Sequence, residues 1–126
     1  MDRPTTRRGL EDACLCAQVA DGFRGKDTIV LDLTDITPIV DYFVITTGSS
    51  PRQLRALGEE VRQVMKSRGN PPMGEEGDER SSWILQDYGD VVLHAFLPEA
   101  RSLYDLEHLW ADARKVDWKQ TAVAAK

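Results

Sequence analysis

The 126-residue sequence has few cysteines, no long apolar run and no excess of basic side chains. Cys14 and Cys16 are its only cysteines, and residues two positions apart in a helical pattern point to different sides of the helix. We therefore expect no disulfide and no local metal-binding pair. Cys14 is expected to be a small apolar core residue, Cys16 to be incidental, and the compartment to be reducing.

The sequence lacks the long apolar runs of membrane-spanning proteins and the basic charge of many nucleic-acid-binding proteins. No apolar stretch approaches the length that crosses a bilayer, and the N-terminus lacks the apolar core of a signal peptide. We therefore expect a cytoplasmic protein without membrane contact. The formal net charge of −5 argues against direct sequence-specific binding to nucleic acid through a broad basic surface, and a basic partner is the more natural match.

The common motifs of nucleotide enzymes and hydrolases are also missing. The sequence has no Gly-Lys-Ser/Thr loop, no Gly-x-Gly-x-x-Gly after a strand, and neither Ser-x-x-Lys nor Gly-x-Ser-x-Gly. His94 and His108 are the only histidines, and they do not form a helical metal-binding pair. We expect no catalytic residues, no cofactor and no metal site.

The Gly48-Ser49-Ser50 turn, between a β-rich run and a helix, can be interpreted in two ways. Free amides at such a helix start can hold phosphate, and nucleotidyl transferases place a Gly-Ser pair here. That chemistry needs paired carboxylates on the next strand to hold a divalent metal. Glu59 and Glu60 are instead adjacent in a helix, and Asp87 and Asp90 flank a turn. We interpret the turn as a strand-to-helix joint and keep a nucleotide-binding or nucleotidyl-transferring enzyme as the alternative.

The length predicts a single domain over residues 1–126. Strands interrupted by a central helix indicate an α/β sandwich on a mixed sheet of about five strands. The charged segment 73–80 is expected to be a loop or a short edge strand, and the tail after about residue 112 to be loosely attached. The apolar patterns predict helices over about 9–23 and 51–68, strands over 28–34 and 41–47, a hairpin over 82–97 and a short helical segment over 101–110.

The central helix has the clearest boundaries in the sequence. Ser50 is predicted as its N-cap, Pro51 as its first residue and Gln53 as the partner in a capping box. Gly69 suits the position just after the last turn. The predicted buried stripe consists of Leu54, Leu57, Val61, Val64 and Met65.

The hairpin around Gly89-Asp90 predicts two different sheet faces. If Tyr88 pairs with Val91, one face is mostly aliphatic and belongs under a helix. The other face can be covered as well, with His94 a core residue, or it can be an aromatic patch open to a partner. The predicted pairs on this second face are Trp83 with Phe96, Leu85 with His94, and Asp87 with Val92.

Several separate motifs occur in one order along residues 10 to 111. Asp41-Tyr-Phe-Val-Ile45 and Gly48-Ser-Ser50 come first, followed after a helix by Glu76-Gly77 and Trp83-Ile-Leu85. Asp87-Tyr-Gly-Asp-Val-Val-Leu-His94, Pro98-Glu-Ala-Arg101, Tyr104-Asp-Leu-Glu107 and Leu109-Trp110 complete the order. This order resembles the ribosomal silencing factor family (RsfS, Iojap-related).

The resemblance implies a protein without enzymatic activity on a nucleotidyltransferase-like fold. Members of the family bind universal large-subunit protein number fourteen on the large ribosomal subunit. They block the joining of the two subunits and so repress translation, and they commonly form homodimers off the ribosome. The acidic net charge fits a basic ribosomal protein as partner.

The same resemblance indicates partner-binding residues, all of them in the second half of the chain. Large aromatic side chains among them can equally be core anchors, and Asp90 can be only a turn residue. A contact from the loop over residues 37–40 is in doubt, because Pro38 departs from the family pattern. The expected contact residues are Trp83, Asp87, His94, Glu99, Arg101, Tyr104 and Trp110, with Glu76 and Asp90 as weaker acidic candidates.

Overall fold

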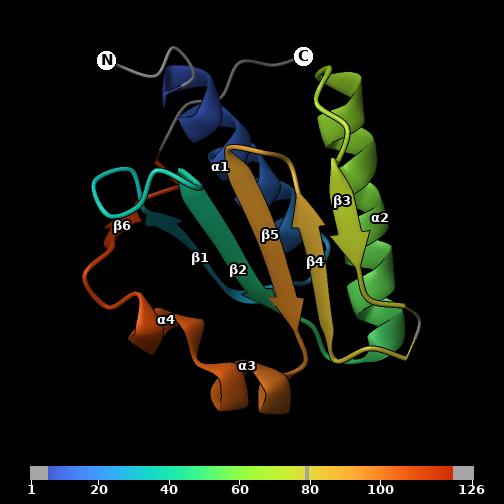
Figure 1. The fold of residues 1–126 in the computed structure, drawn as a ribbon. Helices are drawn as coiled ribbons and strands as arrows, with labels where there is room; N and C mark the ends of the chain where they lie inside the picture. The colour runs from blue at the N-terminus through green and yellow to red at the C-terminus, as the bar shows by residue number, and fades with distance from the viewer. Residues whose placement is uncertain (1–5, 79, 121–126) are drawn as a thin grey trace.

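A computed structural model describes residues 6–78 and 80–120 as an α/β fold with one sheet (Figure 1). The helices are α1 (Thr6–Gly22), α2 (Pro51–Ser67), α3 (Pro98–Tyr104) and α4 (Leu106–Leu109). The strands are β1 (Lys26–Asp32), β2 (Tyr42–Thr47), β3 (Gly74–Glu76), β4 (Trp83–Asp87), β5 (Val91–Phe96) and β6 (Arg114–Val116). The predicted mixed α/β class is confirmed.

The described strands form one sheet of six in the order β3-β4-β5-β2-β1-β6, one more than the predicted five. The pairing of β2 with β5 is parallel and every other pairing is antiparallel. The predicted hairpin register is confirmed, because Trp83 pairs with Phe96 and the Tyr88 amide donates to the Val91 carbonyl at 2.8 Å. Parallel pairing at the centre places both hairpins in one mixed sheet.

Helices α1 and α2 lie side by side behind the sheet and cover one of its faces (Figure 1). The core between them consists of the small side chains of α1, the apolar stripe of α2 and the aliphatic face of the hairpin. The other face is covered only in part, by the short helices α3 and α4 at its lower end (Figure 1). The molecule therefore has a thick helical layer on one side. The other face is only partly open, because a second apolar cluster with Leu31, Ile45 and Phe96 buried lies on it.

The ends of α2 follow the predicted capping signals. The Ser50 hydroxyl accepts a hydrogen bond from the Gln53 amide at 3.1 Å, and Pro51 is the first helical residue. The Gln53 side chain in turn accepts from the Ser49 amide at 2.7 Å. Gly69, with φ of 84°, lies just beyond the last turn, in a conformation that glycine adopts without strain.

Two expectations from the sequence were wrong. Residues 114–116 are not part of a loose tail, because they pair with β1 and Trp118 is buried behind them. Cys16 is not incidental, because its side chain is fully buried in the same core as Cys14. Burial is also the main cause that raises the pKa of the Cys16 thiol, so this group stays protonated at neutral pH.

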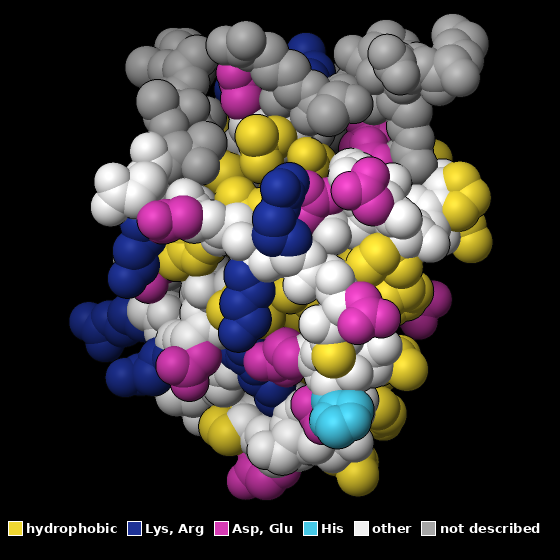
Figure 2. Space-filling model, turned by 90° about the vertical axis from the view of Figure 1, so that its left-hand side faces the viewer, with side chains coloured by type: hydrophobic (Ala, Val, Ile, Leu, Met, Phe, Trp, Pro, Cys, Tyr) yellow, Lys and Arg dark blue, Asp and Glu magenta, His cyan; other side chains and the backbone are white. Residues whose placement is uncertain are grey.

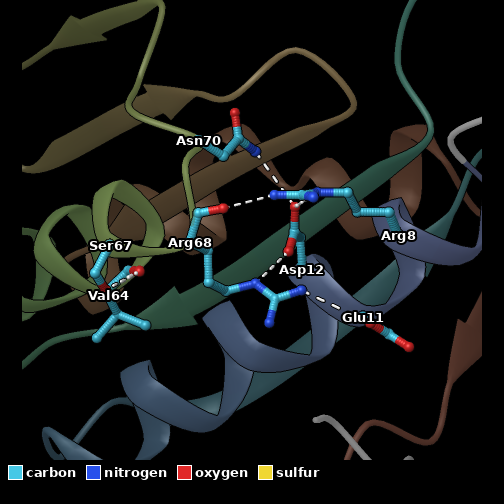
Figure 3. A network of polar contacts seen from close by, with 7 residues as sticks. All are labelled: Arg8, Glu11, Asp12, Val64, Ser67, Arg68 and Asn70. Atoms are coloured by element: carbon cyan, nitrogen blue, oxygen red, sulfur yellow. Dashed lines mark hydrogen bonds and ion pairs between the residues drawn. The ribbon is translucent and has the colours of Figure 1, made fainter. Parts of the chain in front are cut away.

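A polar network joins the start of α1 to the end of α2 (Figure 3). Asp12 is 3% exposed and accepts hydrogen bonds from Arg68 Nε at 2.8 Å and from the Asn70 amide at 3.3 Å. Arg8 donates to the backbone carbonyl of Arg68 at 2.6 Å, and Glu11 lies 3.7 Å from the Arg68 guanidinium. These contacts fix the relative position of the two helices that cover the back of the sheet.

Candidate protein-binding surface

An apolar groove lies on the open face of the sheet, and we call it the front groove. It has a volume of about 310 Å³ and runs over the middle strands β2, β4 and β5. The loop before β2 and the end of α4 form its sides. Its lining consists of Thr37, Ile39, Val40, Phe43, Leu85, Asp87, Val92, His94 and Trp110.

His94 is the most buried titratable side chain of the front groove, at 5% exposure. Its Nδ1 accepts a hydrogen bond from Trp83 Nε1 at 3.1 Å, and its ring meets Phe43 edge-on at 4.5 Å. Burial lowers the pKa of His94 from its ordinary value to about 4, so the ring is neutral at physiological pH. The groove floor therefore carries no positive charge.

Aromatic rings extend from the front groove toward the lower end of the sheet. Trp83 packs on Phe96 with ring centroids 5.0 Å apart and on Tyr104 at 4.5 Å. Trp110 meets Phe43 edge-on at 6.0 Å. Tyr104 remains 48% exposed, so the outer end of this aromatic chain is open to a partner.

Exposed aliphatic side chains border the same face. Ile39 is 84% exposed, and Leu109 and Leu103 on the two short helices are 70% and 76% exposed. Figure 2 shows hydrophobic side chains along its right-hand edge, which is the side of the sheet that faces the viewer in Figure 1. Contiguous exposed apolar surface with polar residues around it is typical of protein-interaction sites.

The structure brings five of the expected contact residues together. His94, Asp87 and Trp110 line the front groove, Trp83 holds the His94 ring, and Tyr104 packs against Trp83 with its ring tilted. The Trp83–His94 pair follows from the hairpin register, whereas the places of Tyr104 and Trp110 depend on the C-terminal helices. The aromatic side chains of the second hairpin face thus form one cluster, in which His94 and Phe96 are buried and Tyr104 is the exposed end.

The other four expected residues lie elsewhere or have internal partners. Arg101 is bound within the chain, to Glu107 at 2.7 Å and to the Thr47 hydroxyl at 2.8 Å. Asp90 is a turn residue whose carbonyl accepts from the amides at the start of β2. Glu76 lies exposed on the edge strand β3, and Glu99 is exposed in the first turn of α3.

Sequence reasoning missed the loop before β2 as part of the surface. The loop over residues 37–40 was considered a doubtful contact, yet Thr37, Ile39 and Val40 form one side of the front groove. Ile39 was the available signal, because an isoleucine in a proline-containing loop has no place in a regular apolar pattern. Its high exposure in the structure makes it a candidate anchor for a partner.

The Gly48-Ser49-Ser50 turn is packed as a joint. The Gly48 amide donates to the carbonyl of Phe96 at 2.8 Å. As described above, the Ser49 amide donates to the Gln53 side chain and the Gln53 amide to the Ser50 hydroxyl. A Cβ atom at Gly48 would lie 2.6 Å from the Leu54 side chain, so the backbone needs glycine here to pack against α2. The turn serves the packing of the chain, and the amides of Gly48, Ser49 and Gln53 already donate to acceptors within the chain.

Within residues 6–78 and 80–120, no three His, Cys, Asp or Glu side chains are grouped so that they could hold a metal ion. No helix among the same residues is long and apolar enough to span a bilayer.

Known proteins are similar to this chain over most of its length. The sequence model of the family described as "Ribosomal silencing factor during starvation" matches residues 6–126. The ribosomal silencing factor RsfS of Chromobacterium violaceum is 40% identical over 96 residues, which are 76% of this chain and 79% of that protein. A mouse protein named "Mitochondrial assembly of ribosomal large subunit protein 1" is 34% identical over 80% of this chain and 45% of its own length.

A solved structure from one of the same organisms has a similar fold. A crystal structure of a Chromobacterium violaceum protein superposes with a TM-score of 0.77 at 34% identity and covers 92% of each chain. The family match extends beyond the expected range of residues 10 to 111 and includes β6 and Trp118. From the agreement of motifs, fold and matched length, this chain belongs to the ribosomal silencing factor family.

Proposed function

We propose that this protein binds the large ribosomal subunit through universal large-subunit protein number fourteen, blocks subunit joining and represses translation. The observation that carries the proposal is the front groove, an apolar and aromatic surface on the open face of the sheet. Large aromatic side chains in such a setting are the usual anchors of protein interfaces. Membership of the silencing factor family supplies the ribosome as the partner.

Charge supports the same partner. The chain has a formal net charge of −5, and Asp87 lies in the front groove without a basic residue in its lining. A basic ribosomal protein would approach this surface with favourable long-range attraction, which mainly raises the association rate. Subunit joining would then be blocked because the bound protein occupies the space that the small subunit needs.

The proposal includes three further statements about the molecule. The protein acts without catalysis, since no catalytic motif occurs in the sequence and the Gly48-Ser49 turn is packed as a joint. It acts in the cytoplasm, where ribosomes are free to be silenced. It forms a homodimer off the ribosome, which would cover the exposed Ile39, Leu103 and Leu109.

Sedimentation with purified ribosomal subunits tests the proposal directly. The protein is expected in the pellet with large subunits and in the supernatant with small subunits. Added before mixing, it is expected to reduce the fraction of joined ribosomes in a sucrose gradient. Failure to pellet with large subunits would overturn the proposal.

Isothermal titration separates the proposal from the enzyme alternative. ATP or CTP with magnesium is expected to give no binding heat, because the helix start at Ser50 is already capped by the chain. Clear nucleotide affinity together with absent subunit binding would favour a nucleotide-binding enzyme. Analytical ultracentrifugation tests the homodimer, which is expected to dissociate on dilution.

A further inference from the structure

The buried imidazole of His94 has one nitrogen whose hydrogen-bonding capacity the chain does not use. Its Nδ1 is engaged by Trp83, but its Nε2 is buried and has no hydrogen-bond partner among the described residues. Leaving a buried polar group unpaired costs roughly 1–3 kcal/mol, so such groups are uncommon in folded proteins. His94 also lines the front groove, so the ring that carries this buried nitrogen is part of the candidate surface.

The contact with Trp83 shows whether Nε2 of His94 is a hydrogen-bond donor or an acceptor. An indole N–H can only donate a hydrogen bond, so the His94 Nδ1 must be the acceptor. A neutral imidazole carries its single proton on the other nitrogen, and the lowered pKa of His94 keeps the ring neutral. Nε2 is therefore an N–H donor, on the part of the ring that points away from Trp83.

We propose that His94 Nε2 donates a hydrogen bond to a neutral oxygen of the bound protein partner, a backbone carbonyl or a side-chain amide, that enters the front groove. The inference rests on the proposed function and adds to it the chemistry that the groove selects. The rest of the lining, from Ile39 to Trp110, is mainly apolar, so the group that carries this oxygen is flanked by apolar contacts. Asp87 lies in the same groove and would repel a carboxylate, which is why the oxygen is expected to be neutral.

Binding requires a local movement, because Nε2 has almost no exposed surface in the free protein. We assign this movement to Trp110, which lines the same groove and follows the four-residue helix α4, a helix with no buried residue. Its ring meets Phe43 edge-on and packs, partly buried, against the apolar cluster of this face. A partner that reaches Nε2 through such a movement would gain the hydrogen bond that the free protein leaves unmade.

Two substitutions separate this role from a purely structural one. In His94→Gln, the side-chain NH₂ lies near the position of Nε2 and keeps the donor, but the acceptor for Trp83 is lost. In His94→Asn, the side-chain oxygen lies near the position of Nδ1 and keeps the Trp83 contact, but the donor is lost. If the donor serves the partner, Asn weakens binding to large subunits roughly tenfold and Gln by less than about threefold. If His94 only holds Trp83, the order is reversed.

Thr46→Val is the matched control for a lost buried hydrogen bond. Thr46 bonds Thr28 at 2.8 Å on the helix-covered side of the sheet, away from the front groove. This variant is expected to melt at a lower temperature and still bind large subunits like the parent. Equal loss of binding in the Thr46 and His94→Asn variants would overturn the inference, because stability alone would then explain both.

Nitrogen NMR of the imidazole tests the donor without any variant. Long-range ¹H–¹⁵N spectra of the free protein at pH 7 are expected to show His94 as the neutral tautomer protonated at Nε2. Addition of the isolated ribosomal protein should shift this Nε2–H signal downfield. A proton on Nδ1, or an unchanged signal in a complex that forms, would overturn the inference and leave the proposed function standing. If the parent protein binds neither the subunit nor the ribosomal protein, the proposed function fails and the inference fails with it.

Discussion

The indole Nε1 of Trp118 donates a hydrogen bond to the backbone carbonyl of Thr28 at 2.9 Å. This contact ties the end of the described chain to the start of β1, while the Trp118 carbonyl accepts from the Gln18 side chain on α1 at 3.1 Å. Trp118 is 8% exposed and belongs to the core behind the sheet. The segment that follows α4 is therefore an integral part of the fold.

Trp118→Ala should lower the free energy of unfolding by about 3 kcal/mol, because it leaves a cavity and an unpaired carbonyl. Urea denaturation followed by circular dichroism measures the change. Lys115→Ala, an exposed position on β6, is the control and should stay within about 0.5 kcal/mol of the parent. Equal stability of both variants would mean that the segment is not part of the cooperative fold.

Asp12→Ala should destabilise the protein by about 3 kcal/mol, because the Arg68 guanidinium would lose its buried carboxylate (Figure 3). The Arg68 side chain is 13% exposed and has Glu11 as its second, more distant partner. Thermal melting measures the loss. The control is Glu59→Ala, which breaks an exposed ion pair with Arg62 and should cost less than about 1 kcal/mol.

Ser50→Ala should cost about 1 kcal/mol, because the Gln53 amide at the start of α2 would lose its acceptor. Ser49→Ala is the matched control, since Ser49 is exposed and its hydroxyl lies 3.5 Å from its nearest acceptor, the Gln53 side chain. Chemical denaturation of the two variants gives the difference. A larger effect at Ser49 would contradict the assignment of the N-cap.

Acid should destabilise the protein through His94. The folded pKa of about 4 lies below the ordinary value of 6.5, so the unfolded chain binds a proton first as the pH falls. The contribution of the neutral His94 ring to the free energy of unfolding is intact above about pH 6.5. It decreases as the pH falls toward 4, by up to about 3 kcal/mol in total. His94→Gln should flatten the stability profile in that window.

Tyr104→Ala should weaken association with the large subunit by about 2 kcal/mol, the size typical of an interface hot spot. Trp83→Ala should have at least that effect, since the Tyr104 ring packs against Trp83. Met73→Ala is the control, because Met73 is 75% exposed but is not part of the front groove. If folded Tyr104 and Trp83 variants still pellet fully with the subunits, these aromatics are bystanders.

Local signals explain why much of the fold could be predicted from the sequence. The caps of α2 and the register of the β4–β5 hairpin depend on residues within a few positions of each other, such as Ser50 with Gln53 and Tyr88 with Val91. Strand β6 has no such signal. Its sequence, Arg-Lys-Val, has two charged residues of three, and it becomes a strand because β1 offers it an edge.

The residue pattern alone predicts the candidate surface only where the hairpin register determines it, whereas Tyr104 and Trp110 were expected from the family resemblance. Trp83 and His94 were placed on one face because their strands are neighbours in sequence. The position of Tyr104 also depends on Asp105, whose φ of 47° turns the chain between α3 and α4. The partner of Arg101, Thr47, lies on a strand far away in the sequence, so only the tertiary structure reveals why Arg101 is held inside.

The parallel pairing of β2 with β5 has a consequence for folding kinetics. The β1–β2 and β4–β5 hairpins each join neighbouring segments, whereas Tyr42 and Val91 are separated in the chain by α2, β3 and β4. Closing that long connection costs entropy before its contacts are made. We expect the two hairpins to form early and their docking along this central seam to limit the rate of folding.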